Sequence, residues 1–293
     1  MNKYAFFIGC TILQALPHLE AVARKVLPQL DIELIDLPFS CCPNSDFRSA
    51  DELSWLALAA RNLALAEREG LDILCLCPGC SQTLKEANMA LIEDESLKTI
   101  INKRLGKIGL KFGGTTQVNH HLVILYRKIE LLRDRINTPL SWMKLAAHPS
   151  CHMLMPSSSM EFDNPEQPGK LDELVKILGG VPVDYPEKTL CCGFGLFGSY
   201  RKTSSMMIKD KVESAASADA EAFVVTCPSC FQQLDRNQVI AKRELKFDVQ
   251  LPVLYYLQLI GLAIGLKLNE VGYSFARIKS SRLEDKIKYI ASA

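Results

Sequence analysis

Short apolar stretches alternate with longer segments of helical periodicity along most of the chain. The apolar stretches have the length of buried strands, and glycine, proline or cysteine follows each of them closely. In the first half this pattern predicts strands over 3–8, 32–37 and 72–76, with helices over 11–30, 50–69 and 81–90. In the second half it predicts strands over 143–147, 181–185 and 222–226, with helices over 171–178, 203–218 and from 231 onward.

Alternating strands and helices indicate an α/β fold with parallel sheets, here two pseudo-symmetric, Rossmann-like halves. We expect the first half over 1–140 and the second over 141–293, the latter with a C-terminal helical segment. Pro17 and Pro28 predict an interrupted first helix, because proline lacks the amide hydrogen that a helix interior needs. We interpret 93–118 as a helix end and connector, 118–136 as an amphipathic helix, and 155–169 as a loop specific to the second half.

Cysteines follow the predicted strands, in the same order in both halves. Each half has one cysteine, then an adjacent pair, then a Cys-Pro-x-Cys segment, with 34 residues between the pair and that segment. Cys191 lies 150 residues after Cys41, and Cys227 and Cys230 lie the same distance after Cys77 and Cys80. This regularity indicates an internal duplication that uses ten of the eleven cysteines. Ligands of parallel sheets bind beyond the carboxyl ends of the strands, so we expect each set of five to converge.

The chemistry of these thiols depends on the surroundings of the chain. The N-terminal apolar run is too short for a signal peptide, so we expect a cytoplasmic protein in which metal or redox chemistry is favoured over stable disulfides. The formal net charge of +1 gives no indication of nucleic-acid binding. The uncharged run over 251–266 has 16 residues, fewer than the ~20 of a membrane span. We interpret it as a buried helix or as a docking surface for a partner subunit.

Five cysteines per half exceed the four ligands of a structural zinc site, and they lack the tight cysteine loop of cubane clusters. The pattern therefore favours an iron–sulfur cluster that is not a simple cube in each half. Zinc in one half and a metal-free Cys-x-x-Cys redox pair remain alternatives. The predicted ligands are Cys10, Cys41, Cys42, Cys77 and Cys80 for the first cluster, and Cys151, Cys191, Cys192, Cys227 and Cys230 for the second.

With these residues the chain resembles the CCG-domain proteins, and along nearly its whole length it is similar to the B-type subunits of heterodisulfide reductase. Further stretches that carry the resemblance are 4–10, 59–63, 77–80, 252–256 and 259–265. One difference is that Pro43, and not glycine, follows the first cysteine pair. The resemblance implies two noncubane [4Fe-4S] clusters, one per half, and an oxidoreductase that reduces the mixed disulfide of coenzyme M and coenzyme B. Related two-repeat proteins leave open another sulfur substrate, as in sulfur oxidation or thiol–fumarate reduction, or a non-catalytic electron-transfer or zinc scaffold subunit.

A pair of clusters suits this chemistry, since breaking a disulfide takes two electrons and a cluster transfers one at a time. The sequence has no dinucleotide-binding fingerprint, so the electrons must come from partner subunits. The resemblance implies a ferredoxin-like iron–sulfur subunit of the C type and a flavin-bearing subunit of the A type.

Several other side chains are weaker candidates for function. His148 and His152 flank Cys151 and are candidate proton donors for the leaving thiolates, or hydrogen-bond donors to cluster sulfur. Arg201 and Lys202 are candidates for binding an anionic thiol or disulfide substrate, or are a solvated surface pair. We interpret His120 and His121 as helix-surface or hydrogen-bonded residues, and Cys75 as a buried thiol.

Overall fold

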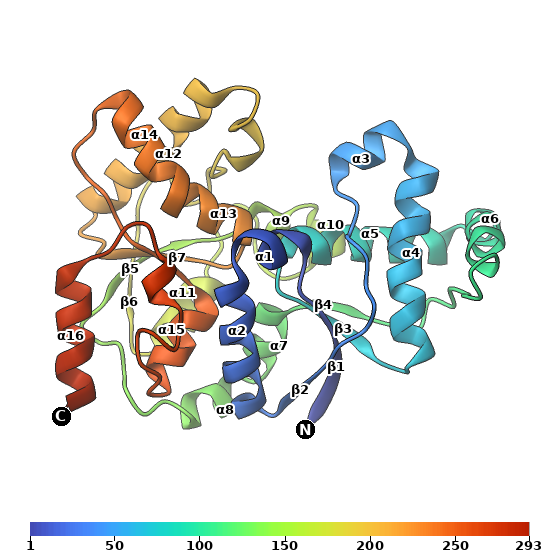
Figure 1. The fold of residues 1–293 in the computed structure, drawn as a ribbon, viewed down its shortest axis with the longest axis horizontal. Helices are drawn as coiled ribbons and strands as arrows, with labels where there is room; N and C mark the ends of the chain where they lie inside the picture. Colours follow the sequence, from blue (N-terminus) through green and yellow to red (C-terminus); the bar gives the residue numbers. More distant parts are fainter. Residues whose placement is uncertain (293) are drawn as a thin grey trace.

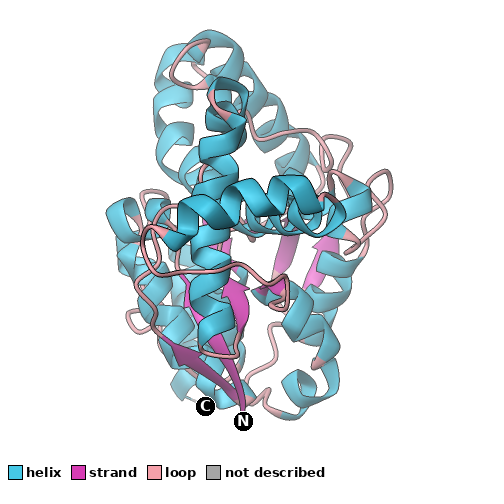
Figure 2. Ribbon diagram, turned by 90° about the vertical axis from the view of Figure 1, so that its right-hand side faces the viewer, coloured by secondary structure: helices cyan, strands magenta, loops and turns pink. Residues whose placement is uncertain are grey.

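A computed structural model describes residues 1–292, with side chains to residue 287. Two four-stranded sheets, both entirely parallel, form the interior, with strand orders β2-β1-β3-β4 and β6-β5-β7-β8. Figure 2 shows the strands enclosed by helices. The first sheet contains β1 (Asn2–Phe7), β2 (Ile32–Ile35), β3 (Asp72–Cys75) and β4 (Val118–His120), and the second contains β5 (Lys144–His148), β6 (Val181–Val183), β7 (Ala222–Val225) and β8 (Val253–Tyr255). The two-half α/β prediction is confirmed.

The helices of the first half follow its strands along the chain (Figure 1). They are α1 (Cys10–Ala15), α2 (Pro17–Val26), the 3-10 turn Leu27–Leu30, α3 (Ser45–Ala50), α4 (Glu52–Arg68), α5 (Pro78–Glu93), α6 (Glu95–Gly106), α7 (His121–Arg127) and α8 (Ile129–Asp134). The first helix is interrupted at Leu16, as the prolines predicted. The connector predicted over 93–118 is wrong in part, because Asp94 caps the helix α6 with its side chain.

The second half has the helices α9 (Cys151–Leu154), α10 (Ser157–Met160), α11 (Lys170–Ile177), α12 (Arg201–Ser217), α13 (Pro228–Gln232), α14 (Gln238–Leu245), α15 (Tyr256–Ala263) and α16 (Ser281–Ser292). Short 3-10 turns lie at Phe194–Leu196 and Tyr273–Phe275, and the π turn Gln233–Asn237 joins α13 to α14. The boundary that we propose near residue 140 falls in the connection between α8 and β5.

The fourth strand of each sheet was missed by the sequence reasoning. β4 and β8 are three residues long and run directly into α7 and α15, so strand and helix merge into one apolar segment. The helix predicted over 118–136 is therefore wrong at its start, and His120 and His121 are not on a helix surface. Both histidines are fully buried where β4 meets α7.

Helices of each half pack against helices of the other half across their junction. The helix α15 of the second half packs against α2 of the first, and α8 of the first half packs against α11 of the second. All eight residues of α15 are buried, and many belong to an apolar cluster that contains residues of both halves. The docking surface predicted over 251–266 is thus wrong, because partners cannot reach this helix.

A tyrosine joins the halves beside the cysteines. The hydroxyl of the fully buried Tyr255 is in hydrogen-bonding contact with the main-chain oxygens of Leu76 and, at 2.8 Å, Thr226. Leu76 precedes Cys77 and Thr226 precedes Cys227. His120, the residue of β4 that corresponds to Tyr255 of β8, donates from Nε2 to the same Leu76 oxygen at 3.0 Å. The strand ends that carry the two Cys-Pro-x-Cys segments are therefore held together.

Replacing Tyr255 should weaken this junction. We expect Tyr255→Phe to lower the free energy of unfolding by about 1–3 kcal/mol, because buried carbonyl oxygens lose their donor. Anaerobic urea unfolding measures the effect, with Tyr200→Phe, at a side chain that is 66% exposed, as the control. Equal stability of the two variants would contradict the role given to Tyr255.

Candidate metal centre

All ten repeated cysteines lie beyond the carboxyl ends of strands. Cys10 and Cys151 begin α1 and α9, Cys77 and Cys227 are the N-caps of α5 and α13, and the two adjacent pairs lie in the loops after β2 and β6. Cysteines thus stand at the starts of α1, α5, α9 and α13. Figure 1 shows these four helices near the middle of the molecule, where α1 contacts α13 and α5 contacts α9. Cys75 ends β3 and is fully buried, as predicted.

The first five thiols contact one another. The sulfur atoms of Cys41 and Cys10 are 3.7 Å apart, and those of Cys42 and Cys80 are 2.8 Å apart. Cys77 and Cys80 stand at the N-cap and in the first turn of α5, and Cys80 helps to lower the pKa of Cys77. All five are free thiols. The structure therefore brings together the residues predicted as the first ligand set.

The second five thiols form a corresponding array. Each thiol shifts the pKa of the next in the order Cys151, Cys191, Cys192, Cys230 and Cys227, and the sulfur atoms of Cys192 and Cys230 lie within 4.8 Å of each other. The two arrays meet where Tyr255 binds the main chain directly before Cys77 and Cys227, and each of these two thiols shifts the pKa of the other. The ten predicted ligands thus lie around the junction of the halves.

Mutual hydrogen bonding separates the acidities of these thiols. Contact with Cys41 and then with Cys80 lowers the pKa of Cys42 to about 4, and contact with Cys151 and then Cys192 lowers the pKa of Cys191 to about 2. Contact with Cys227 and then Cys80 holds the pKa of Cys77 well below its usual value. Both sets therefore contain thiols that ionise readily, which is the form that binds metal.

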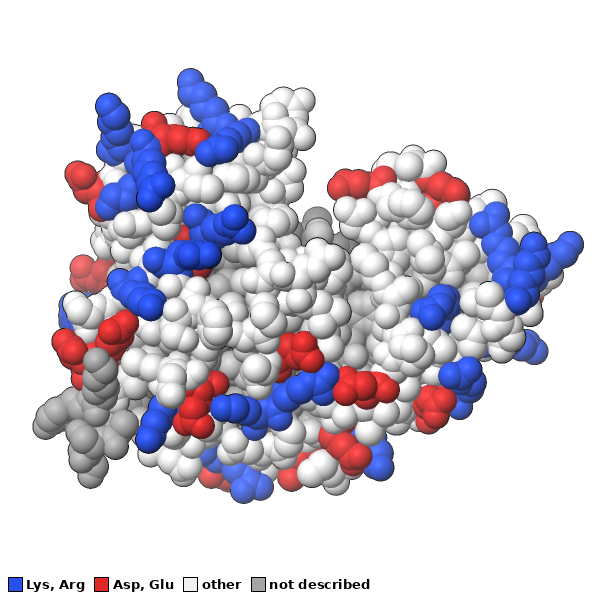
Figure 3. All heavy atoms as spheres, viewed as in Figure 1, with Lys and Arg blue, Asp and Glu red and all other residues white. Residues whose placement is uncertain are grey.

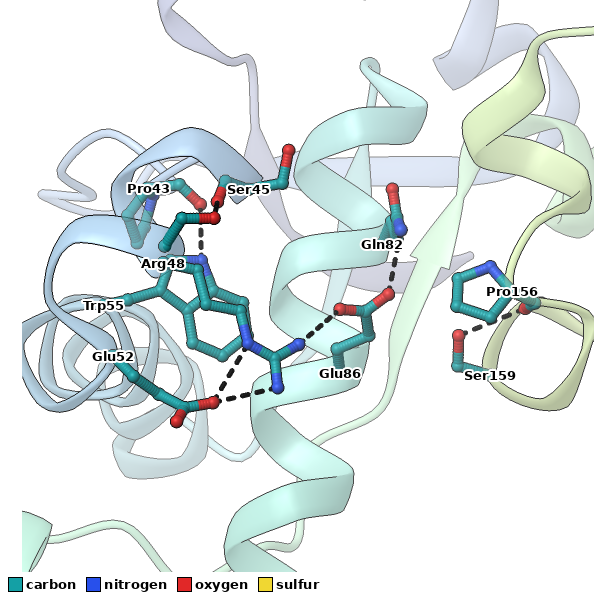
Figure 4. A network of polar contacts seen from close by, with 10 residues as sticks. Pro43, Ser45, Arg48, Glu52, Trp55, Gln82, Glu86, Pro156 and Ser159 are labelled. Atoms are coloured by element: carbon teal, nitrogen blue, oxygen red, sulfur yellow. Dashed lines mark hydrogen bonds and ion pairs between the residues drawn. The ribbon is translucent and has the colours of Figure 1, made fainter.

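The loop of the first cysteine pair is held from α4. The side-chain oxygen of the fully buried Asn62 accepts a hydrogen bond from the Ser40 amide at 2.9 Å, and its nitrogen donates to the Ser40 carbonyl at 3.2 Å. The indole of Trp55 donates to the carbonyl of Pro43 at 3.0 Å (Figure 4). Arg48 lies over the Trp55 ring and pairs with Glu52 and Glu86. Pro43 is compatible with the ligand loop, since its carbonyl serves as an anchor.

The second pair is held by other residues. Gln233, in the π turn, donates to the carbonyl of Cys192 at 2.9 Å, and Ser204 donates to the carbonyl of Gly193 at 2.8 Å. Gly193 has a φ of 80°, and a Cβ there would lie 3.0 Å from the sulfur of Met207. Glycine is therefore required in the Cys-Cys-Gly segment, whereas the first half needs none.

Removing the Asn62 side chain should loosen the first loop only. We expect Asn62→Ala to destabilise the fold by about 1–3 kcal/mol and to speed alkylation of Cys41 and Cys42, because the partly buried main chain of Ser40 loses its partners. Anaerobic alkylation followed by peptide mass spectrometry measures the effect. Asn102 makes the same paired bonds to Phe112, so Asn102→Ala is the matched control. Equal alkylation rates in both variants would contradict the assignment.

The two predicted histidines lie in different surroundings. His152 is exposed on α9 of the second half, but its Nδ1 is 3.0 Å from where a Cβ on Gly79 of the first half would lie. It also helps to lower the pKa of Cys42. His148 is 1% exposed, and burial lowers its pKa to about 3. One histidine thus lies at the surface between the two halves, and the other lies inside the second.

The predicted anion-binding residues begin α12 and are both exposed. Arg201 pairs with Glu244 at 2.6 Å and lies over the ring of Phe197. Figure 3 shows basic side chains on the lobe formed by α12 and α14 and acidic ones on the lobe of α3, with a notch between them. The geometry brings neither Arg201 nor Lys202 into contact with a cysteine among the described interactions.

The sequence reasoning missed the residues that hold and surround the thiols. Asn62 and Tyr255 lie in stretches that carry the family resemblance and Gln233 does not, but the roles of all three follow only from contacts with distant main-chain groups. The fully buried Lys211 of α12 was also missed, although a lysine within a helix that covers a cysteine site is a detectable signal.

These thiols suit a metal cluster. They are free, they contact mainly one another, and the amide groups at the start of α5 face Cys77 from a helix N-terminus, which favours negative charge. A narrower group, His148, Cys192 and Cys230, has its ligand atoms within 4.8 Å of one another. That His-Cys-Cys set resembles a zinc site, so the second half also suits zinc.

Comparison with known proteins agrees with this architecture. The cysteine-rich domain profile CCG matches residues 4–85 and 145–235. Over 298 residues the chain is 37% identical to the B-type subunit of the ferredoxin:CoB-CoM heterodisulfide reductase of Methanosarcina mazei, covering 100% of this chain and 99% of the relative. It is 33% identical to the 8-methylmenaquinol:fumarate reductase membrane anchor subunit of Wolinella succinogenes, covering 96% of this chain and 99% of that one.

A solved structure supports the fold alone. A hypothetical protein from Helicobacter pylori superposes with a TM-score of 0.77 at 15% identity, over 96% of this chain and 53% of that chain. The fold and the two thiol sets define a cysteine-rich protein built from two CCG repeats. The chain belongs to the family of the B-type subunits of heterodisulfide reductase. Among residues 1–292, no helix has the length and apolar character that crossing a membrane requires.

Proposed function

We propose that this chain is the catalytic subunit of a heterodisulfide reductase and reduces the mixed disulfide of coenzyme M and coenzyme B to two thiols. The observation that supports the proposal is the hydrogen bonding of Tyr255 to the main chain directly before both Cys77 and Cys227, since it ties together the strand ends that lead to the two cysteine sets. A disulfide bound at that junction would lie within reach of both sets. The 37% identity to heterodisulfide reductase subunits along the whole chain supports the substrate class.

The ten cysteines would hold two noncubane [4Fe-4S] clusters, five in each half. Such clusters supply electrons one at a time, and cleavage of a disulfide needs two. The ionised thiols provide the ligand form, and the hydrogen bonds of Asn62 and Gln233 keep the paired cysteines in position. The protein's own contribution is thus to hold both sulfur sites and the substrate in one arrangement.

Protons and substrate charge are handled by residues outside the ligand set. His152 is exposed beside Gly79 and is our proposed proton donor to a leaving thiolate. His148 is enclosed next to Cys192 and Cys230, so we propose hydrogen bonding to sulfur for it and not proton exchange with substrate. Arg201 and Lys202 remain our candidates for an anionic group of the substrate. Electrons would arrive from iron–sulfur and flavin subunits of the C and A types.

Metal content tests the proposed ligand sets. We expect about eight irons and as many acid-labile sulfides per anaerobically purified chain, in keeping with two four-iron clusters. Elemental analysis and sulfide determination measure both. About four irons with one zinc would favour the alternative in which His148, Cys192 and Cys230 hold zinc, and absence of iron would leave a scaffold subunit.

Turnover tests the reaction and the proton donor together. We expect the chain to reduce the mixed disulfide with an artificial low-potential reductant, and His152→Ala to lower kcat by about 10²-fold, because general acids contribute roughly 10²–10⁴-fold. Thr11, which follows Cys10 as His152 follows Cys151, supplies the control variant Thr11→Ala. Turnover of another disulfide but not this one would move the substrate to a related thiol. Absence of any turnover would favour a pure electron-transfer role, as the similarity to a quinol:fumarate reductase subunit allows.

A further inference from the structure

The inner walls of the two thiol sets differ in polarity. Resting on the proposed function, we infer that Lys211 and His148 give the second cluster the higher reduction potential, so that the first electron from the partner subunits comes to rest there. The two repeats would then hold the same kind of cluster at unequal potentials. The observations that carry this inference are the buried charge of Lys211, the unpartnered ring of His148, and the apolar counterpart of that ring in the first half.

Lys211 is a buried cation without a carboxylate partner. Its side chain is 1% exposed, its ammonium donates to the main-chain oxygen of Glu187, and it lies 5.6 Å from the centre of the Tyr185 ring. No ion pair joins it to any acidic side chain of the described residues. Burial lowers its pKa to about 8, while the side chains of Cys192, Cys230 and Cys191, ahead of Glu187, favour its charged form. The side chains that most favour the charge of Lys211 therefore belong to the second cysteine set.

His148 faces the same sulfur atoms from β5. A ring nitrogen, Cys192 Sγ and Cys230 Sγ all lie within 4.8 Å of one another. Both ring nitrogens are buried and neither makes a well-formed hydrogen bond among the described residues, although the main chain of Lys188 is close enough to favour protonation of the ring. A buried N–H group without a partner is costly, and sulfur that carries negative charge can accept the bond. The ring is thus placed to donate to a cluster held by the second set.

The first half has neither group at the corresponding places. His148 ends β5 and pairs in register with Val225, and Phe7 ends β1 and pairs in register with Cys75. Cys75 lies 150 residues before Val225, so Phe7 occupies the place of His148 in the first half. Phe7 is 2% exposed and packs on the ring of Phe39 at 5.0 Å. The first half therefore has a hydrocarbon ring without N–H groups at the place where the second half has the imidazole of His148.

The counterpart of Lys211 at the same 150-residue spacing is Arg61. Its guanidinium is partly exposed and donates to the carbonyl of Pro38 and to the side chain of Asn62. It therefore serves the loop and not the sulfur atoms. The side chain of His152 also favours the ionised form of Cys42, but it is exposed to solvent, which screens its influence.

Reduction adds one negative charge to a cluster, so nearby positive charge and N–H donors favour the reduced form. The effect is greatest where water is excluded, because the local dielectric constant is low. Lys211 and His148 meet both conditions, whereas Phe7 is buried but has no charge or N–H group, and Arg61 is charged but partly exposed. The second cluster should then accept an electron at a higher potential than the first.

A redox titration of the holo chain tests this. The native protein should show two separate one-electron transitions when titrated with mediator dyes and followed by electron paramagnetic resonance. In Lys211→Met we expect only the higher transition to move, to lower potential, with at least about a tenfold change in the reduced-to-oxidised ratio, ~59 mV for one electron. Lys211→Arg keeps the positive charge, so the potential of its higher transition should stay close to that of the native protein. Lys209→Met removes the same charge from an exposed site on the same helix, where Lys209 pairs with Glu213, and should leave both transitions unchanged.

His148→Phe provides an independent variant, because it installs the residue of the first half and keeps a planar ring. This variant should lower the potential of the same, higher transition. Coincident transitions in the native chain, or a Lys211→Met shift in the lower transition, in both equally or in neither, would overturn the inference while the proposed function stands. Loss of half the iron in both variants would also overturn it, since the two residues would then serve assembly. A native chain without iron removes the proposed function, and the inference with it.

Discussion

The closure of the two halves onto each other at the strand ends directly before Cys77 and Cys227 is the constraint on which the rest of the structure depends. Each sheet by itself would present five thiols at the carboxyl edge of its strands. The hydroxyl of Tyr255 and the ring of His120 bind the main chain immediately before the Cys-Pro-x-Cys segments, so the two edges cannot separate without exposing buried carbonyl groups. The packing of α15 and α8 against helices of the opposite half buries further apolar surface at the same junction. The two sets of five thiols therefore lie at one shared junction.

This closure also explains why the most apolar segment of the chain is neither a membrane span nor a docking surface. A helix such as α15 that is apolar on every side must be surrounded, and the first half supplies α2 as one of its neighbours. In this chain the apolar residues of α15 form part of the core.

Duplication produced two ligand sets, but their supports have diverged. The first cysteine pair is anchored by Asn62 and by the Pro43 carbonyl, and the second by Gln233 from a π turn together with a glycine of positive φ. The inner walls diverge in the same way, with Phe7 in one half and His148 in the other. Because the supports control position and the walls control charge, the same five thiols can serve different steps in the two halves.

The sequence by itself determined the repeat, the alternation of strands and helices, and the position of ten cysteines after strand ends, because these depend on spacing within a few dozen residues. It failed at β4 and β8, where a three-residue strand passes into a helix without a turn, and local periodicity cannot separate them. Of its two interpretations of His120 and His121, the helix surface is wrong, since both are fully buried, whereas His120 is hydrogen-bonded as the other interpretation held. The meeting of the two thiol sets, the burial of α15 and the environments of His148 and Lys211 were decided only by the tertiary structure. They depend on contacts between residues far apart in the chain, such as Tyr255 and Leu76, which are 179 positions apart, and no pattern along the sequence records which faces will pack together.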